Sequence, residues 1–219
     1  MTYSLLGRCA RTGQFGAAVT TSSIAVGSRV PHVAPGVGGV LTQHRTDPRL
    51  GPRGLELLRS GCSAEETLAA LVASTPHHKW RQLAVLDARG RTAHFHGAAV
   101  KPALNAVHVP DCVALGNILA NDRVPAAMAA AFTASADQPL AERLVRAMEA
   151  GEAAGGEGKP VISAALVVME KEIFPLVDLR VDLAPDAMTA LRALWDAYAP
   201  SMREFVTRAL DPDAAPGVI

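Results

Sequence analysis

Very short turns separate several apolar segments of this chain, and they constrain the fold more than any other feature. Segments 2–9 and 15–21 flank the turn 11–14, in which Gly13 accepts a positive φ. A second pair of β-rich segments lies within 82–96 and flanks an Asp-Ala-Arg-Gly turn. Strands joined by such short turns pair antiparallel, because parallel strands need a long crossover connection. The sequence therefore predicts antiparallel sheets.

Helices are expected in groups between the strands. One helix is predicted over 50–59, ended by Gly61, and a capping box formed by Ser63 and Glu66 begins the next. Two alanine-rich helices follow at about 123–134 and 138–150. A final helix begins at Pro185 and places Leu191, Leu194, Trp195 and Tyr198 on one face. Further strands are expected at 33–42, 106–115 (broken by Pro110), 163–169 and 176–183, with a glycine-rich loop at 151–160.

Grouped helices cover the faces of sheets, so this order favours an α+β fold. We predict a four-layer αββα sandwich of two antiparallel sheets. A single sheet with helices on one face is the alternative. The 219 residues suffice for one large domain, 1–219, with a frayed tail at 211–219.

Composition excludes several classes of function. The 21 basic and 21 acidic residues balance, so no basic field is present to hold a nucleic acid. No apolar run approaches the roughly 20 residues of a membrane span, and no secretory signal is apparent. The three cysteines form neither a disulfide framework nor a CxxC site. We expect a cytoplasmic protein with reduced thiols that binds neither nucleic acid nor membranes.

Thr2 is the residue with the clearest chemical potential. Methionine is usually trimmed when a small residue follows it, so the mature chain could begin with Thr2. A terminal threonine carries a nucleophilic hydroxyl together with an α-amine of pKa near ~8 that can take the proton.

The sequence also resembles a known protein family in an ordered series of motifs. The matches extend to about residue 168 and comprise Thr2-Tyr3-Ser4-Leu5, Thr12-Gly13 with Phe15-Gly16, Ala25-Val26-Gly27, Val30-Pro31, Gly36-Val37-Gly38, Thr42-Gln43, Gly51-Pro52-Arg53-Gly54-Leu55 with Leu57-Leu58, Arg81-Gln82, Val85, Asp87, Gly116-Asn117-Ile118-Leu119, Glu149 to Gly156, and Ser163-Ala164-Ala165-Leu166. Together they resemble the bacterial family designated domain of unknown function 1028, regarded as N-terminal-nucleophile (Ntn) hydrolases.

This resemblance implies the αββα fold and a Thr2 nucleophile, but no substrate. The chain departs from the family at two places. Ser22 stands where members often have Lys or His. Glu157, Gly158 and Lys159 stand where Asp and Arg often follow the double glycine. Lys159 could replace the missing arginine, as a point charge and not a fork.

Other polar residues are candidates for the same site. Asn117 is our choice for the oxyanion donor, since its amide donates without carrying charge. Ser22 and Ser23 are candidate substrate-binding residues, with ordinary hydroxyls on a strand surface as the alternative. Gln43 is another candidate, with strand-end hydrogen bonding as its alternative. Arg53 is a further candidate. It lies at the start of a predicted helix, where a cation is unfavourable and needs an anionic partner. We favour Asp47 or Asp87 as that partner over a substrate carboxylate.

Metal and cofactor signals are weak. His94 and His96 lie two apart on a predicted strand and share a face, but no other ligand completes a set nearby in sequence. No dinucleotide or phosphate-loop motif is present. We therefore predict no metal and no cofactor.

The leading hypothesis is a hydrolase of C–N bonds other than peptide bonds, which cleaves a small amide or lactam by acyl transfer to Thr2. A non-catalytic small-molecule-binding or scaffold protein that keeps Met1 is the alternative. A proteasome-like peptidase is a third, which the balanced charge and lack of an assembly signature disfavour. The alanine-rich helices at 123–150 could pack against a second copy, so a homo-oligomer is compatible with the sequence.

Overall fold

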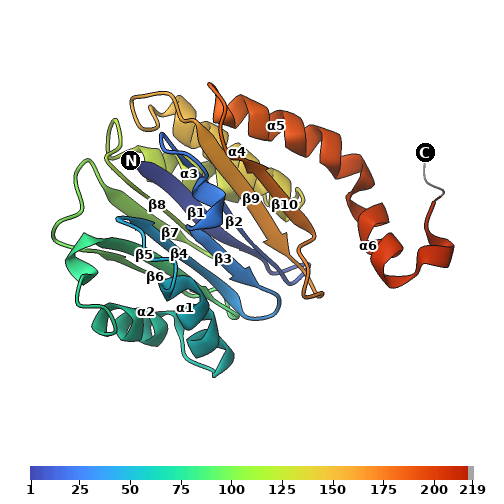
Figure 1. The fold of residues 1–219 in the computed structure, drawn as a ribbon, viewed down its shortest axis with the longest axis horizontal. Coiled ribbons are helices and arrows are strands. Elements are labelled where there is room, and N and C mark those ends of the chain that lie inside the picture. Colours follow the sequence, from blue (N-terminus) through green and yellow to red (C-terminus); the bar gives the residue numbers. More distant parts are fainter. Residues whose placement is uncertain (217–219) are drawn as a thin grey trace.

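A computed structural model describes residues 1–216 and shows a four-layer αββα sandwich (Figure 1). The larger sheet has six antiparallel strands in the order β10-β9-β2-β1-β8-β7. Its strands are β1 (Thr2–Cys9), β2 (Gln14–Thr21), β7 (Asn105–Val109), β8 (Cys112–Asn117), β9 (Ser163–Met169) and β10 (Val177–Val181).

The smaller sheet has four strands in the order β3-β4-β5-β6. They are β3 (Pro31–Ala34), β4 (Gly38–His44), β5 (Arg81–Asp87) and β6 (Thr92–His96). The two predicted hairpins are confirmed as β1–β2 and β5–β6, with Gly13 at φ 71° in the first turn.

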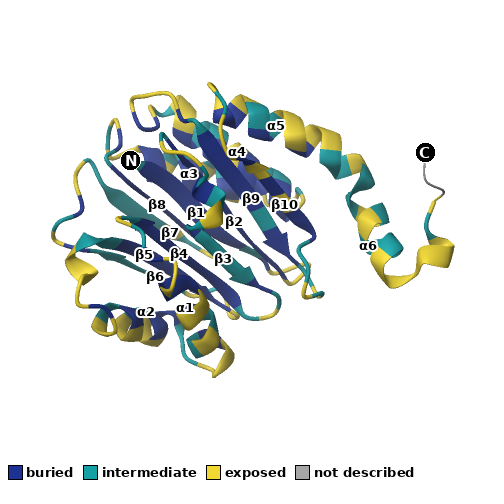
Figure 2. Cartoon of the chain, in the orientation of Figure 1, coloured by how far each residue is buried: buried dark blue, intermediate teal, exposed yellow. Residues whose placement is uncertain are grey.

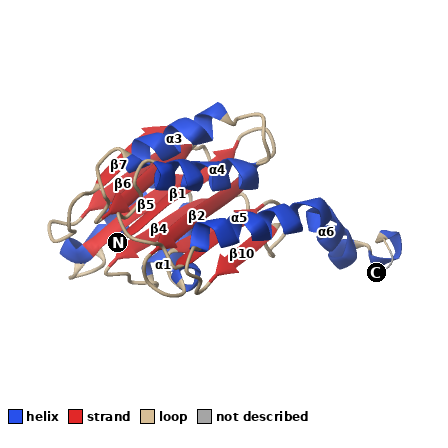
Figure 3. Ribbon diagram, turned by 90° about the horizontal axis from the view of Figure 1, so that it is seen from above, coloured by secondary structure: helices blue, strands red, loops and turns tan. Residues whose placement is uncertain are grey.

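Helices cover the outer face of each sheet. Figure 3 shows α3, α4 and α5 lying over the larger sheet, while α1 and α2 lie beneath the smaller one in Figure 1. The α-helices are α1 (Leu50–Arg59), α2 (Ala64–Ala73), α3 (Val124–Ala134), α4 (Leu140–Ala153), α5 (Ala187–Tyr198) and α6 (Met202–Leu210). Short 3-10 turns occupy Val26–Ser28, His78–Trp80, Ala199–Ser201 and Pro212–Ala214.

The two faces of β1 serve different cores, as the two-residue period of a strand requires. Tyr3 and Leu5 pack in the cluster beneath the helices, and Leu6 packs in the cluster between the sheets. Figure 2 shows the central strands of both sheets buried and the edge strands β3, β6 and β7 mostly half-buried, with exposed surface on the outer sides of the helices. A Cβ on Gly39 of β4 would lie 2.7 Å from Leu6 Cδ2, so this glycine permits the close approach of the sheets.

Two predicted single strands prove to be hairpins. The segment predicted as one strand over 33–42 contains the end of β3, a turn and most of β4, with Gly36 at φ 68° in the turn. The segment 106–115 likewise divides into β7 and β8 around Pro110 and Asp111, which has φ 62°. Both predictions missed the turn because valines on either side of it looked like one continuous apolar run.

The C-terminal part also differs from the prediction. Asp186, and not Pro185, caps α5 by accepting from the Thr189 amide, and α6 follows it. In Figure 1, α6 extends away from the sandwich. Leu194 is exposed rather than part of the buried face, and α4 continues three residues into the predicted glycine-rich loop. Of the predicted frayed tail, 217–219 lie outside the described residues.

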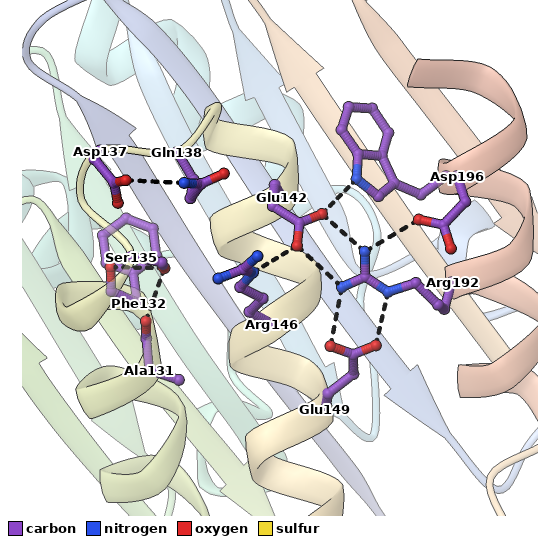
Figure 4. Close-up of polar contacts among 11 residues, drawn as sticks. Ala131, Phe132, Ser135, Asp137, Gln138, Glu142, Arg146, Glu149, Arg192 and Asp196 are labelled. Carbon is purple, nitrogen blue, oxygen red and sulfur yellow. Dashed lines mark hydrogen bonds and ion pairs between the residues drawn. The ribbon is translucent and has the colours of Figure 1, made fainter. Parts of the chain in front are cut away.

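An ionic cluster holds α5 against α4. Arg192 of α5 donates to both Glu142 and Glu149 of α4, at 2.8 and 2.7 Å (Figure 4). Glu142 also accepts from the Trp195 indole at 2.7 Å. The two acidic partners raise the pKa of Arg192 and keep its charge in place at the helix interface. This contact ties the outer helix layer together above the larger sheet.

Candidate active site

Thr2 begins the central strand of the larger sheet and lies between two polar neighbours. The register places it opposite Asn117 of β8, and its hydroxyl lies 3.5 Å from the hydroxyl of Thr21 on β2. Strand alternation puts its side chain on the face of Ser4, which points toward the smaller sheet. Only 6% of Thr2 is exposed, so the hydroxyl lies in an environment that contains little water.

The Met1 carbonyl occupies the hydrogen-bonding positions around this hydroxyl. It accepts from Thr2 Oγ1 and from Thr21 Oγ1, the latter at 2.5 Å. Met1 itself is half-buried, and burial lowers the pKa of its α-amine below the usual value, an effect that the nearby Glu157 carboxylate opposes.

A chain of buried amides crosses from one sheet to the other beside Thr2. Ser4 donates to Gln43 Oε1 at 2.7 Å, and Gln43 Nε2 donates to Gln82 Oε1 at 2.7 Å. Asn117 Nδ2 donates to the same Gln82 oxygen at 2.7 Å. All four residues are fully buried, and such a buried polar chain holds its side chains in a single arrangement when its bonds are satisfied.

The backbone determines the direction of every bond in this chain. Gln82 Nε2 donates to the Gly116 carbonyl at 2.7 Å, and a carbonyl oxygen can only accept. Gln82 Oε1 must therefore face Gln43 and Asn117, and both must turn their NH2 groups toward it. One N–H of Asn117 is used in this way, which leaves its second N–H, while Asn117 Oδ1 has no hydrogen-bond partner among residues 1–216.

His96 of β6 closes the chain as an acceptor. Its Nδ1 lies 2.8 Å from Gln82 Nε2, which requires that this ring nitrogen be unprotonated. Burial, with the neighbouring His94, lowers the pKa of His96 to about 4. The imidazole is therefore neutral at physiological pH, in agreement with its accepting role.

Glu157 adds a carboxylate at the edge of the same site. It is only 5% exposed, and its Oε2 accepts from the backbone N–H of Ser22 at 3.0 Å. Its Oε1 is buried and has no hydrogen-bond partner within the described chain. Burial raises the pKa of Glu157, and the Ser22 hydrogen bond and the Met1 amine oppose this shift.

The loop that carries Glu157 is hydrogen-bonded to the segment that follows β8. Gly155, Gly156 and Gly158 all have positive φ, at 121°, 51° and 67°. The Gly156 carbonyl accepts from the Ala120 amide at 3.0 Å, just after the end of β8. The glycines therefore fold the loop back toward the strand end where Thr2 and Asn117 lie.

The structure brings together some of the predicted site residues but not all. Asn117 and Gln43 belong to the buried chain beside Thr2, and Ser22 reaches the site through its backbone amide. Ser23 turns away, since its hydroxyl accepts from Arg29 at 2.6 Å. Lys159 is exposed.

Arg53 lies elsewhere, on the exposed side of α1. It donates to the Ser74 hydroxyl at 2.7 Å, at the C-terminal end of α2. The predicted anionic partner is therefore wrong, because Asp47 pairs with Arg49 and Arg81, and Asp87 pairs with Arg91. A helix-terminal hydroxyl and carbonyl replace the carboxylate that we expected.

Sequence reasoning missed Gln82 and Glu157 as site residues. Gln82 had a signal, since it lies in the Arg81-Gln82 motif of the resembled family. Glu157 also had one, because it follows the double glycine where that family often carries Asp. What was missing was the spatial evidence that each residue approaches Thr2 from a different element.

Three histidines form a cluster that adjoins the buried chain at His96. His108 of β7 joins His94 and His96, with its Nε2 2.7 Å from His94 Nδ1. Among residues 1–216, no three His, Cys, Asp or Glu side chains are arranged to hold a metal ion. No helix in the described part of the chain is long and apolar enough to cross a membrane.

The fold and this site define an αββα protein with a buried threonine at the start of a central strand. The chain belongs to the family described as "Family of unknown function (DUF1028)", whose model matches residues 2–191. It is similar to the crystal structure of protein SPO2555 from Silicibacter pomeroyi, which carries the same family assignment, with 31% identity and a TM-score of 0.84 over 90% of this chain and 89% of that one.

A second solved structure is similar only distantly. Anbu (ancestral beta-subunit) from Yersinia bercovieri shares 11% identity at a TM-score of 0.42 over 99% of both chains. None of the curated proteins compared with this chain matches it.

Proposed function

We propose that this protein is an Ntn-type amidohydrolase that cleaves a small amide or lactam after removal of Met1 exposes Thr2. The observation that carries the proposal is the position of Thr2. Its hydroxyl lies buried at a strand end, beside Thr21 and opposite Asn117, above a chain of amides with a defined direction. Removal of Met1 frees the hydroxyl from its bond to the Met1 carbonyl.

The reaction would be acyl transfer. Thr2 Oγ1 attacks the carbonyl carbon of the substrate, and the released α-amine of Thr2 accepts the hydroxyl proton. The second N–H of Asn117 donates to the oxyanion that develops, because Gln82 holds the other one. The C–N bond then breaks, the amine passes its proton to the leaving nitrogen, and water hydrolyses the Thr2 ester.

The other site residues would support these steps. Gln43 and Gln82 orient Asn117 from the smaller sheet, and Thr21 holds the carbonyl group that lies against Thr2, as it now holds that of Met1. Ser22 follows β2 and binds Glu157 through its backbone amide. Ser23 is not part of this proposal, since its hydroxyl accepts from Arg29. Arg53 is not part of this proposal, since its contacts lie at the end of α2.

Intact-protein mass spectrometry of untagged protein tests the proposal. We expect loss of Met1 and, on incubation with a threonine-reactive β-lactone, one adduct that maps to Thr2. Thr2→Ala should abolish the adduct, and Asn117→Ala should slow its formation by about 100–1000-fold, as for loss of an oxyanion donor. Met1-free protein that forms no adduct would overturn the mechanism.

The alternative is a binding protein that keeps the fold without catalysis. The observation in its favour is that the hydroxyls of Thr2 and Thr21 both donate hydrogen bonds to the Met1 carbonyl in the structure. Retention of Met1 in the untagged protein, together with no adduct, would support this alternative.

A further inference from the structure

We propose that the substrate carries a free α-amino group on its acyl part, and that Glu157 binds this ammonium in the site. The inference rests on the proposed function, because it concerns the acyl group that Thr2 would receive. It names the substrate class as α-aminoacyl amides.

The first support is the state of Glu157. Glu157 is only 5% exposed. One of its carboxylate oxygens, Oε2, accepts a hydrogen bond from the Ser22 amide at 3.0 Å. The other oxygen is buried without a partner in the described chain. A buried carboxylate is costly unless a cation or several donors accompany it, so this oxygen is suited to receive a positively charged ligand.

The second support is Met1, which is itself an α-aminoacyl group placed against the nucleophile. Its carbonyl accepts from the Thr2 and Thr21 hydroxyls. Thr21 is adjacent in sequence to Ser22, whose amide binds Glu157, so the carbonyl and the carboxylate lie on two successive residues of one strand end. The Glu157 carboxylate raises the pKa of the Met1 α-amine against the effect of burial, although the two groups form no direct ion pair.

Loss of Met1 would vacate this position and leave Glu157 in place. An acyl group that enters with its carbonyl against Thr2 would then occupy the space of Met1 and carry its α-ammonium toward the same carboxylate. Attack by Thr2 Oγ1 forms the ester, the C–N bond of the substrate breaks, and the departing amine takes the proton held by the Thr2 amine. The ammonium of the acyl part keeps its charge throughout.

The test compares two probes that differ only in the amine. One is an α-amino-β-lactone with a free amine, and the other is its N-acetyl form. We expect the Met1-free wild type to form the Thr2 adduct at least ~10-fold faster with the free amine, as for a charge-assisted hydrogen bond. Glu157→Gln should remove this preference, and Glu157→Asp should retain part of it.

Glu152→Gln is the matched control, since Glu152 lies exposed near the start of the same loop. It should leave the preference unchanged. Circular dichroism establishes that each variant is folded. If Glu157→Gln slows both probes equally, Glu157 serves the Thr2 amine and the inference is wrong. Equal labelling of the wild type by both probes would also overturn it, whereas no labelling by either would instead refute the proposed function.

Discussion

Replacement of Gln82 by leucine should strongly destabilise the fold. The side chain is fully buried and makes four hydrogen bonds, two as acceptor and two as donor. Leucine has a similar volume but leaves the NH2 groups of Gln43 and Asn117 without an acceptor. Each unsatisfied buried group costs about 1–3 kcal/mol, so these two amide groups alone account for a loss of about 2–6 kcal/mol. A typical domain has only about 5–15 kcal/mol in total.

Urea denaturation followed by circular dichroism measures this loss, and Gln14→Leu is its control. Gln14 is also on a strand and only 5% exposed, but within residues 1–216 its side chain has a single partner, Glu170 at 2.8 Å. Its replacement should cost about 1 kcal/mol. If Gln82→Leu costs no more than Gln14→Leu at an unchanged m-value, the buried chain does not stabilise the protein as we describe.

The same variant reports on the orientation of Asn117. Without Gln82, nothing requires Asn117 to turn its NH2 group toward the smaller sheet, and its amide can rotate. We therefore expect Gln82→Leu to slow formation of the Thr2 adduct in protein that is still folded, while Gln14→Leu keeps the wild-type rate. An unchanged rate would show that the direction of the amide chain is not needed by the site.

Two further predictions concern pH and helix docking. The folded pKa of His96, about 4, lies below its unfolded value, so its contribution to stability is complete above pH ~6.5 and is lost as pH falls toward 4. We expect this loss of stability to be about 1–2 kcal/mol after solvent screening of the partly exposed ring. In urea melts, His96→Asn should flatten the dependence of the unfolding free energy on pH. An unchanged pH dependence in this variant would contradict the prediction. Arg192→Met should destabilise α5 by about 1–2 kcal/mol and raise its amide exchange, because the interface with α4 loses its shared cation. Arg180→Met, which breaks an exposed pair with Asp182, is the control and should leave α5 unchanged.

The sequence by itself determined most of the fold. Turn residues and short spacings predicted the β1–β2 and β5–β6 hairpins, and the Ser63–Glu66 capping box predicted the start of α2. These signals are local, because turn geometry and helix caps depend on residues within one turn of each other. Where a turn lay between valine-rich segments, as near Gly36, local hydrophobicity concealed it.

Only the tertiary structure decided which residues form the site. Thr2 and Asn117 meet because β1 and β8 are neighbours, although more than half of the chain separates them in sequence. Gln82 enters from the other sheet and Glu157 from a loop behind α4. Arg53, in the most distinctive motif of the chain, lies on an outer helix instead. Local sequence patterns do not predict these contacts between distant residues, because hydrogen bonds between sheets depend on strand order and on how closely the two sheets pack.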